Sequence, residues 1–316
     1  MMQANLQVTS NDLAKMHMPQ KDAQIRWHKL QGLEAYMKSR VLGQNDALVR
    51  ISRALEAAEC ELNERGPRPR GSFLFMGPSG VGKTETTKAF NEYLFGNDRL
   101  TMLFMNQLQS ASDVEVLIAA IKRGVTSHPE GTVFLFDEIE KAHKSIIDVF
   151  ISLLDEGQAT GPNGERISVG NCYLVMTSNI GAQRWPAMQT TLYSTMEGFA
   201  CDQAKKILRP ELFWRINETV IFRPLSQETQ IAILGSVLEA KLAHVEPKLG
   251  KLSIDTKPVN AHLLRKCFTQ AGGARRLRDE LNRQINLAVL PWEMTGSKPV
   301  EGKFFCNVAK DRLELR

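Results

Sequence analysis

One eight-residue segment, Gly77–Thr84, constrains the fold of this chain more than any other part of the sequence. Its residues, GPSGVGKT, match the pattern G-x-x-x-x-G-K-[ST] of a phosphate-binding loop. The apolar run 72–76 precedes the segment directly, and a helical stretch follows it. In that setting the glycines let backbone N–H groups close around an anion at the start of the helix. The sequence therefore predicts an α/β fold built around a phosphate site.

The loop also assigns roles to its side chains. Lys83 is expected to reach the β- and γ-phosphates of a nucleotide, and Thr84 to hold Mg²⁺. A glycine turn that binds nothing is the alternative, and the strand–loop–helix context disfavours it. The residues predicted to bind the nucleotide here are Gly77, Pro78, Ser79, Gly80, Val81, Gly82, Lys83 and Thr84.

A second motif complements the loop. The apolar run 132–136 ends in Asp137 and Glu138. Strand ends are often acidic merely because they are solvated, so the pair gains meaning only from the earlier loop. In that combination Asp137 would meet Mg²⁺ beside Thr84, and Glu138 would polarise a water. We therefore expect ATP and Mg²⁺ as cofactors, Thr84 and Asp137 as metal ligands, and Asp137 as part of the nucleotide site.

The rest of the chain divides into three parts. Short apolar runs alternate with helical stretches, which favours a parallel sheet covered by helices on both faces. The predicted strands are 72–76, 102–105, 132–136, 173–176 and 219–222. After Pro224 we expect helices at 226–242, 259–270 and 275–290, and short strands near 252–254, 303–308 and 312–316. The predicted domains are an arm with a linker-like helix (1–39), a large nucleotide-binding domain (40–224) and a small helical lid that ends in short strands (225–316).

Composition limits the classes of protein to consider. The 316 residues exceed what one core usually fills, and 43% hydrophobic with 24% charged residues is an ordinary globular balance. The net charge of +5 permits a nucleic-acid partner without requiring one. Five scattered cysteines indicate neither a disulfide framework nor a zinc site. No run approaches the ~18 apolar residues of a membrane helix, and no signal-peptide pattern is present, so we expect a cytoplasmic protein with no membrane partner.

The order of further motifs resembles a AAA+ ATPase of the Clp/ClpB class, specifically its second ATPase module standing alone. The phosphate loop, the stretch FLFDEIEKAH (134–143), MTSN (176–179), RPELFWRI (209–216) and GAR (273–275) follow one another as in that family. Residues 8–12 and 40–44 are similar to the linker and adenine-pocket segments that precede the module. The resemblance covers nearly the whole chain and implies a AAA+ αβα sandwich with a five-stranded parallel sheet plus a small lid.

The resemblance implies further site residues. Asn179 would be the sensor that places the attacking water, and Arg215 the arginine finger that reaches the γ-phosphate of a neighbouring subunit. Arg275 would be the second sensor, which closes the small domain over the nucleotide. The adenine contacts would be Val41, Leu42 and Gly43. Singly, Asn179 could simply end a strand, and the two arginines could be solvated surface charges. A finger acting between subunits implies a nucleotide-dependent homo-hexamer.

One departure from the family concerns substrate grip. Clp-type unfoldases carry an aromatic–glycine pore loop, commonly GYVG, whereas residues 107–131 contain no Phe, Tyr or Trp. Within this segment, the helical stretch 113–122 of the present chain has an apolar face that is typical of a helix packed on a core. The later loop 157–166 has the form of the family's second pore loop, with Asn163 and Gly164 as a turn signal, and also lacks an aromatic residue. Torsins lack the aromatic loop too, but Arg215 and the missing signal peptide argue against that branch.

These observations favour a cytoplasmic ATPase that forms a ring and remodels or assembles a protein partner of unknown identity, in the manner of a chaperone but without processive threading. One alternative is a nucleotide-gated structural component of a larger complex. Another is a DNA-linked ATPase, such as a loader or a transposition regulator. The net charge and the basic clusters at 65–70 and 275–283 motivate that last alternative.

Overall fold

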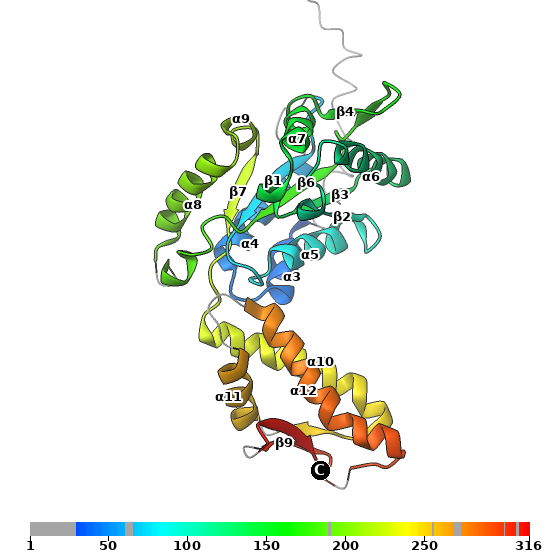
Figure 1. Ribbon diagram of the computed structural model, residues 1–316, viewed down its shortest axis with the longest axis vertical. Coiled ribbons are helices and arrows are strands. Elements are labelled where there is room, and N and C mark those ends of the chain that lie inside the picture. The colour runs from blue at the N-terminus through cyan, green and yellow to red at the C-terminus, as the bar shows by residue number, and fades with distance from the viewer. Residues whose placement is uncertain are drawn as a thin grey trace, which may run out of the picture.

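A five-stranded parallel sheet forms the centre of the larger of two lobes in the computed structural model of the chain (Figure 1). The strand order is β2-β3-β6-β1-β7. The strands are β1 (Gly71–Met76), β2 (Leu100–Phe104), β3 (Val133–Asp137), β6 (Tyr173–Ser178) and β7 (Glu218–Ile221). The structure describes residues 30–60, 66–188, 191–254, 256–267, 273–299, 301–307 and 310–316.

The five predicted strands are confirmed, with ends that differ by at most two residues. All six residues of β1 are buried, because helices cover both faces of the sheet. Phe73 and Phe75 point into one core cluster, and Leu74 and Met76 point into the other. This alternation across a doubly covered sheet explains why the strands read as unbroken apolar runs.

Two helical layers complete the sandwich. One core cluster includes residues of α3 (Leu33–Arg40), α4 (Asn45–Glu59) and α5 (Lys83–Phe95). The other, on the opposite face, includes residues of α6 (Asp113–Ser127), α7 (Lys144–Glu156), α8 (Tyr193–Ile207) and α9 (Pro210–Phe213). The apolar face expected along residues 113–122 is thus core, since Leu117, Ile118 and Ile121 of α6 are buried. The predicted αβα sandwich is confirmed.

Short elements connect these layers. Three 3₁₀ turns, η1 (Met105–Gln107), η2 (Ile139–Lys141) and η3 (Trp185–Met188), follow β2, β3 and β6. An antiparallel hairpin of β4 (Gln158–Thr160) and β5 (Arg166–Ser168) occupies the loop with the Asn-Gly signal. In its turn Gly164 takes the left-handed conformation, with φ of 76°. The hairpin leaves α7 directly and lies on the far side of the large lobe from the lid (Figure 1).

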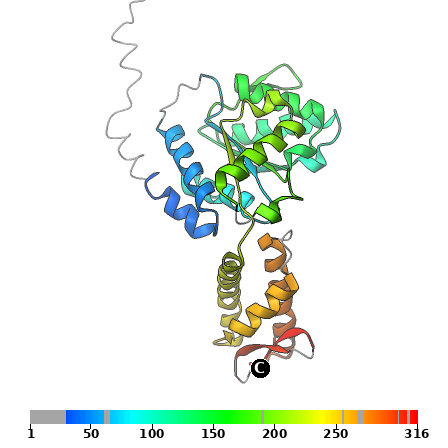
Figure 2. The same cartoon turned by 90° about the vertical axis from the view of Figure 1, so that its left-hand side faces the viewer.

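The smaller lobe is a helical lid that ends in a small sheet. Its elements are α10 (Gln227–Leu249), β8 (Ser253–Ile254), α11 (Thr256–Cys267), α12 (Gly273–Thr295), β9 (Lys303–Asn307) and β10 (Arg312–Leu315). Strand β9 pairs with β8 in parallel and with β10 in antiparallel fashion. Figure 2 shows the lid below the sheet domain, with the segment between β7 and α10 passing from one lobe to the other. Ser226 caps α10 and accepts a hydrogen bond from the Thr229 N–H at 3.2 Å.

Two lid helices are longer than predicted. α10 continues past Leu242 to Leu249, and α12 continues past residue 290 to Thr295. Buried Val245 and Leu249 of α10 pack into the lid core, so tertiary contacts extend the helix through a segment whose own pattern is weak. Residues 268–270, the expected end of α11, lie outside the described ranges. The same holds for residues 1–29 of the predicted arm, with the linker-like segment 8–12.

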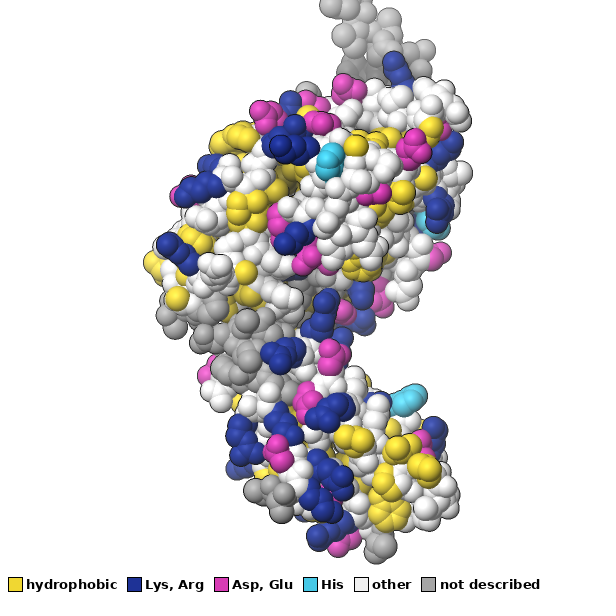
Figure 3. Space-filling view, viewed as in Figure 1, with side chains coloured by type: hydrophobic (Ala, Val, Ile, Leu, Met, Phe, Trp, Pro, Cys, Tyr) yellow, Lys and Arg dark blue, Asp and Glu magenta, His cyan; other side chains and the backbone are white. Residues whose placement is uncertain are grey.

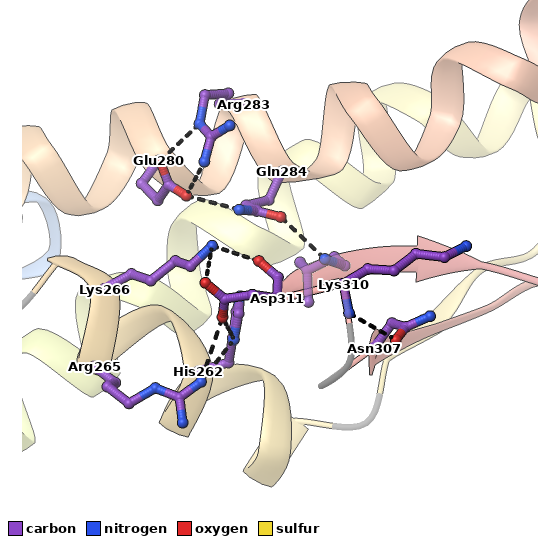
Figure 4. A network of polar contacts seen from close by, with 10 residues as sticks. His262, Arg265, Lys266, Glu280, Arg283, Gln284, Asn307, Lys310 and Asp311 are labelled. Atoms are coloured by element: carbon purple, nitrogen blue, oxygen red, sulfur yellow. Dashed lines mark hydrogen bonds and ion pairs between the residues drawn. The ribbon is translucent and has the colours of Figure 1, made fainter.

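A polar network joins the lid helices to the final hairpin (Figure 4). Asp311, between β9 and β10, pairs with Lys266 of α11 at 3.0 Å and lies 3.5 Å from Nδ1 of His262. Gln284 of α12 is almost fully buried and donates to Glu280 at 2.7 Å. Its Oε1 accepts the N–H of Leu313 in β10 at 3.0 Å. Each described helix after α10 is therefore tied to the C-terminal strands.

None of the helices in the described part of the chain combines the length and the apolar character that crossing a bilayer requires.

Candidate nucleotide-binding site

The phosphate loop turns between β1 and α5 and needs glycine at two positions. Gly77 has φ of 150°, and a Cβ there would lie 2.4 Å from the carbonyl oxygen of Phe222. Gly82 has φ of 112°, and a Cβ there would lie 2.8 Å from a methyl group of Val41. Both backbones are left-handed and closely packed, so a larger residue would move the loop. The sequence pattern reflects this geometry.

Lys83 is the first residue of α5, and its side chain is buried among polar groups of the loop. Its Nζ donates to the carbonyl oxygens of Gly77 at 2.6 Å and Pro78 at 2.7 Å, and to Oδ1 of Asn179 at 2.9 Å. Only 7% of the residue is exposed. The ammonium group is therefore held at the mouth of the loop by uncharged acceptors.

This burial changes the acidity of Lys83. Desolvation of the charged ammonium is the main cause, and it lowers the pKa from 10.5 to about 8. The charge of Arg275 lowers the pKa further, while the carboxylates of Asp137, Glu140 and Glu138 oppose the shift. An anion placed against Nζ would favour the protonated form, because it supplies the close negative charge that the site lacks.

The two acids after β3 are held in different ways. The Thr177 hydroxyl of β6 donates to Asp137 Oδ1 and accepts the N–H of Glu138 at 3.1 Å. Glu138 has φ of 60° and ψ of 55°, a left-handed conformation that few non-glycine residues adopt. Such conformations persist where the surrounding structure enforces them, often at functional sites. Here the turn carries the Glu138 carboxylate out of the strand direction.

Asn179 connects the loop to the acids. Its Nδ2 donates to Oε1 of Glu138 at 3.0 Å, while its Oδ1 accepts from Lys83. Its backbone N–H donates to Oε1 of Glu140 at 3.1 Å. The other oxygen of Glu140 is buried and has no hydrogen-bond partner among the described residues. Lys83, Asn179 and Glu138 thus form one chain of hydrogen bonds across the carboxyl ends of the central strands.

These groups line one cavity to which both lobes contribute. The large lobe supplies loop residues, Asp137, Glu138 and Asn179, and the lid supplies residues of α10 and α12. The N–H of Ala274 in α12 donates to the carbonyl of Gly80 at 2.9 Å, which fixes the start of α12 against the loop. The lining residues are Ser39, Arg40, Val41, Leu42, Ser79, Gly80, Val81, Gly82, Lys83, Thr84, Glu85, Lys88, Asp137, Glu138, Asn179, Ile233, Ser236, Val237, Ala274, Arg275 and Arg278.

Most of the predicted site residues therefore meet at this cavity, including Val41, Leu42 and Arg275 from distant parts of the chain. Gly43 does not line it; this residue has φ of 76° and faces the side chain of Thr229. Gly77 and Pro78 lie behind the cavity and offer their carbonyl groups to Lys83.

Arg215 lies elsewhere in the same subunit. It follows α9, whose label in Figure 1 is at the end of the large lobe away from the lid. Its Nε donates to Oδ2 of Asp155 in α7 at 2.7 Å, and its Nη1 donates to the carbonyl of Glu211 at 2.6 Å. The side chain contributes nothing to the cavity lining of its own chain.

Sequence reasoning missed several residues of the site. Arg278 lines the cavity one turn after Arg275 on α12, and helical spacing from Arg275 was the signal that could have found it. Lys88 lies on α5 one turn after Thr84 and could have been found in the same way. Thr177 and Glu140 act by contacts between strands or turns, so no local pattern marks them.

The donor set suits a hard divalent cation. Thr84 and Asp137 offer a hydroxyl and a carboxylate in a cavity that also holds the phosphate loop. Mg²⁺ is commonly bound by one or two such protein oxygens together with phosphate oxygens and water. In the described ranges no group of three or more His, Cys, Asp and Glu side chains could bind a metal by itself.

Comparison with known proteins agrees with this architecture. Residues 68–219 match the family described as AAA domain (Cdc48 subfamily). Chaperone protein ClpB 1 of Nostoc sp. is 33% identical over an alignment that covers 81% of this chain and 31% of the relative. ClpB of Aquifex aeolicus is 33% identical over 81% of this chain and 27% of its own length. A homolog of the Clp protease ATP-binding subunit ClpA, from Cyanidium caldarium, is 31% identical over 87% of this chain and 34% of its own length.

The chain thus spans about a third of the length of the curated relatives it matches. These matches cover 81% to 87% of this chain and so extend beyond the AAA domain at residues 68–219. With the strand order, the phosphate loop and a cavity between the large lobe and the lid, these similarities identify the chain as a Clp-class AAA+ ATPase module.

Proposed function

We propose that the chain binds ATP with Mg²⁺ in the cavity between its lobes and hydrolyses ATP to ADP and phosphate. The observation that carries this proposal is the hydrogen-bonded chain Lys83–Asn179–Glu138, which joins a phosphate loop to a carboxylate within one cavity. Thr84 and Asp137 would hold Mg²⁺, which would bridge phosphate oxygens and neutralise their charge. Val41 and Leu42, with the adjoining Gly43, would form the adenine contact.

Each side chain of the site would have a separate role in ATP binding or hydrolysis. Lys83 would bind the β- and γ-phosphates. The Glu138 carboxylate would accept a proton from the attacking water, since a base must lie within hydrogen-bond reach of the proton it removes. Asn179 would orient that water from beside Glu138. Arg275, opening the lid helix α12, would couple lid position to the bound nucleotide.

We propose further that the protein acts as a nucleotide-dependent homo-hexamer. Arg215 lies outside its own cavity, so it would act on a nucleotide bound by a neighbouring copy. A guanidinium supplied from outside the site can raise phosphoryl-transfer rates by ~10³–10⁵. In this arrangement the residues 1–39, 40–224 and 225–316 serve as arm, ATPase domain and lid. Among the described residues, Cys172, Cys201 and Cys306 form no disulfide, which supports a reducing compartment, the cytoplasm.

The work of the ring would be to remodel or assemble a protein partner. The names of relatives as chaperones support a protein substrate. Processive threading is not part of the proposal, because neither 107–131 nor the β4–β5 hairpin offers an aromatic side chain for grip. We therefore expect ATP hydrolysis without global unfolding of a stable tagged protein. Unfolding of such a protein would show that other residues grip it.

ATP binding to matched lysine variants tests the site. Calorimetry should show no measurable affinity for Lys83→Ala, because the buried ammonium that would meet the phosphates is gone. Lys122→Ala is the control: that lysine is exposed on α6 and pairs with Glu165 far from the cavity. Equal affinity in wild type and Lys83→Ala would refute the site.

A second candidate function, a DNA-linked ATPase, is favoured by the charge of the lid. Residues 225–316 hold 15 Lys and Arg against 10 Asp and Glu, whereas residues 1–224 hold 25 of each. Figure 3 shows Lys and Arg side chains gathered over one side of the lid. Measuring turnover with unfolded protein, with duplex DNA and with neither separates the candidates. DNA stimulation that falls steeply with salt would favour this second function, and no stimulation by either would favour a structural component.

A further inference from the structure

Two arginines share one carboxylate at the end of α7. Asp155 lies one residue before the last residue of that helix, Glu156. Its Oδ2 accepts from Nε of Arg215 at 2.7 Å, and its Oδ1 accepts from Nη2 of Arg68 at 3.3 Å. The Asp155 and Arg215 side chains are 34% and 31% exposed. The pair is therefore partly withdrawn from solvent at the edge of the large lobe.

Two of the three guanidinium nitrogens of Arg215 have hydrogen-bond partners within this subunit. Besides the contact between Nε and Asp155, its Nη1 donates to the carbonyl of Glu211. A planar guanidinium donates from both of its edges, so two such contacts fix the orientation of its plane. The Nη2 group has no hydrogen-bond partner in the described part of the chain. It is free to donate to water or to a group of a neighbouring copy.

The carboxylate of Asp155 lies beside a closely packed turn at Gly157. Gly157 ends α7 with φ of 63°, and a Cβ there would lie 1.6 Å from the carbonyl oxygen of Pro67. The end of α7 is thus packed directly against the segment that carries Arg68 and leads into β1. After Gly157 the chain continues directly into β4. Asp155 therefore cannot move with a displaced Arg215 side chain unless this packed turn also moves.

We propose that Asp155 is a positioning residue for Arg215: it orders the guanidinium before two copies meet, so that Nη2 is presented to the nucleotide of the neighbour. The inference rests on the proposed role of Arg215. Ordering a free arginine side chain costs rotamer entropy. A side chain that is already ordered does not incur this cost in the transition state. The effect of Asp155 therefore falls on turnover and not on nucleotide affinity.

The chain offers a matched control on the same helix. Asp148, seven residues earlier in α7, pairs with Nη2 of Arg209 at 2.5 Å. Arg209 immediately precedes α9, so both pairs join α7 to the segment 209–215. A purely structural role in docking α9 would be shared by the two aspartates. A positioning role belongs to Asp155 alone.

The test compares Asp155→Asn and Asp148→Asn in full-length protein, each alone and combined with Arg215→Ala, by steady-state ATP hydrolysis. We expect Asp155→Asn to lower kcat about tenfold with KM for ATP within about twofold of wild type. Asp148→Asn should stay within about twofold on both. With Arg215→Ala present, Asp155→Asn should have no further effect, because there is no guanidinium left to position.

Equal losses from the two aspartate variants would overturn the proposal, as would a tenfold loss that persists in the Arg215→Ala background. So would full kcat in Asp155→Asn. A wild type without turnover would instead refute the proposed function. Hydrogen exchange at the Arg215 Nε–H, followed by NMR in arginine-labelled protein, gives a readout independent of activity. It should be faster in Asp155→Asn and unchanged in Asp148→Asn; unchanged exchange in Asp155→Asn contradicts the proposal.

Discussion

Lys83 places a buried positive charge at the centre of the candidate site. Its ammonium is buried against two carbonyl groups and one amide, with carboxylates only at longer range. Burial depresses the pKa to about 8, so below that pH the folded protein holds a charge that is poorly solvated. The same arrangement prepares the loop for phosphate, whose charge would offset the desolvation.

This depressed pKa has a consequence for stability. Between about 8 and 10.5, the folded protein binds fewer protons at Lys83 than the unfolded chain does, so the free energy of unfolding rises with pH. Relative to Lys83→Met, wild type without nucleotide should gain about 2 kcal/mol between pH 7 and pH 9.5. Urea unfolding of both proteins at the two pH values measures this difference. A constant difference would show that the Lys83 pKa is not depressed.

At the residue scale, the sequence predicts residues that a local backbone geometry requires, and it misses residues whose role depends on contacts with distant parts of the chain. The glycines of the loop were readable because the turn requires glycine, and the acids Asp137 and Glu138 because they end an apolar run. Asn179 and Arg275 were assigned by resemblance alone. Thr177 could not be found, because its hydroxyl contacts Asp137 on the neighbouring strand, far away in the sequence. The left-handed backbone of Glu138 was likewise invisible, since nothing in a glutamate indicates it.

At the element scale, burial decides what could be predicted. The five strands were found because both faces of the sheet are covered and their sequences are therefore continuously apolar. Helix α8 (Tyr193–Ile207) was not predicted, since it buries only Met196, Ala200 and Ala204 along a narrow stripe. The helices of the lid were found, but their ends were set by packing in the lid core.

The lid network supplies a prediction of its own. Gln284→Leu should lower the free energy of unfolding of the lid by about 1–3 kcal/mol, because it leaves the Leu313 N–H buried without an acceptor. Asn286→Leu, at an exposed position of the same helix, is the control. Thermal unfolding followed by near-ultraviolet circular dichroism, to which Trp292 of the lid contributes, measures the effect. Equal melting of the two variants would contradict the role given to Gln284.

At the scale of the whole molecule, two exposed apolar side chains lie near the proposed finger in the sequence. Trp214 is 69% exposed and Ile207 is 55% exposed, and both lie close to Arg215 in sequence at α8 and α9. The Trp214 ring packs against Phe213 and under Nζ of Lys205, at 4.8 Å from the ring centroid. A tryptophan held in this way can anchor a protein interface. In the proposed ring it would be covered by the neighbouring copy.

Trp214→Ala should therefore weaken self-association in the presence of ATP by about 2 kcal/mol or more, roughly thirtyfold in dissociation constant. Leu192→Ala removes another side chain that is 74% exposed, at the other end of α8, and should leave association unchanged. Sedimentation velocity over a range of protein concentrations provides the measurement. Identical behaviour of the two variants would remove Trp214 from the interface.

In the proposed function, Glu138 activates water on a nucleotide held by Lys83. The most direct test follows phosphate release by wild type and Glu138→Gln, with ATP binding measured on the same samples by calorimetry. Glutamine keeps an oxygen to accept from Asn179 but cannot take a proton. Glu138→Gln should bind ATP at least as tightly as wild type while releasing phosphate ~10²–10⁴ times more slowly. Phosphate release at the wild-type rate would contradict this role of Glu138.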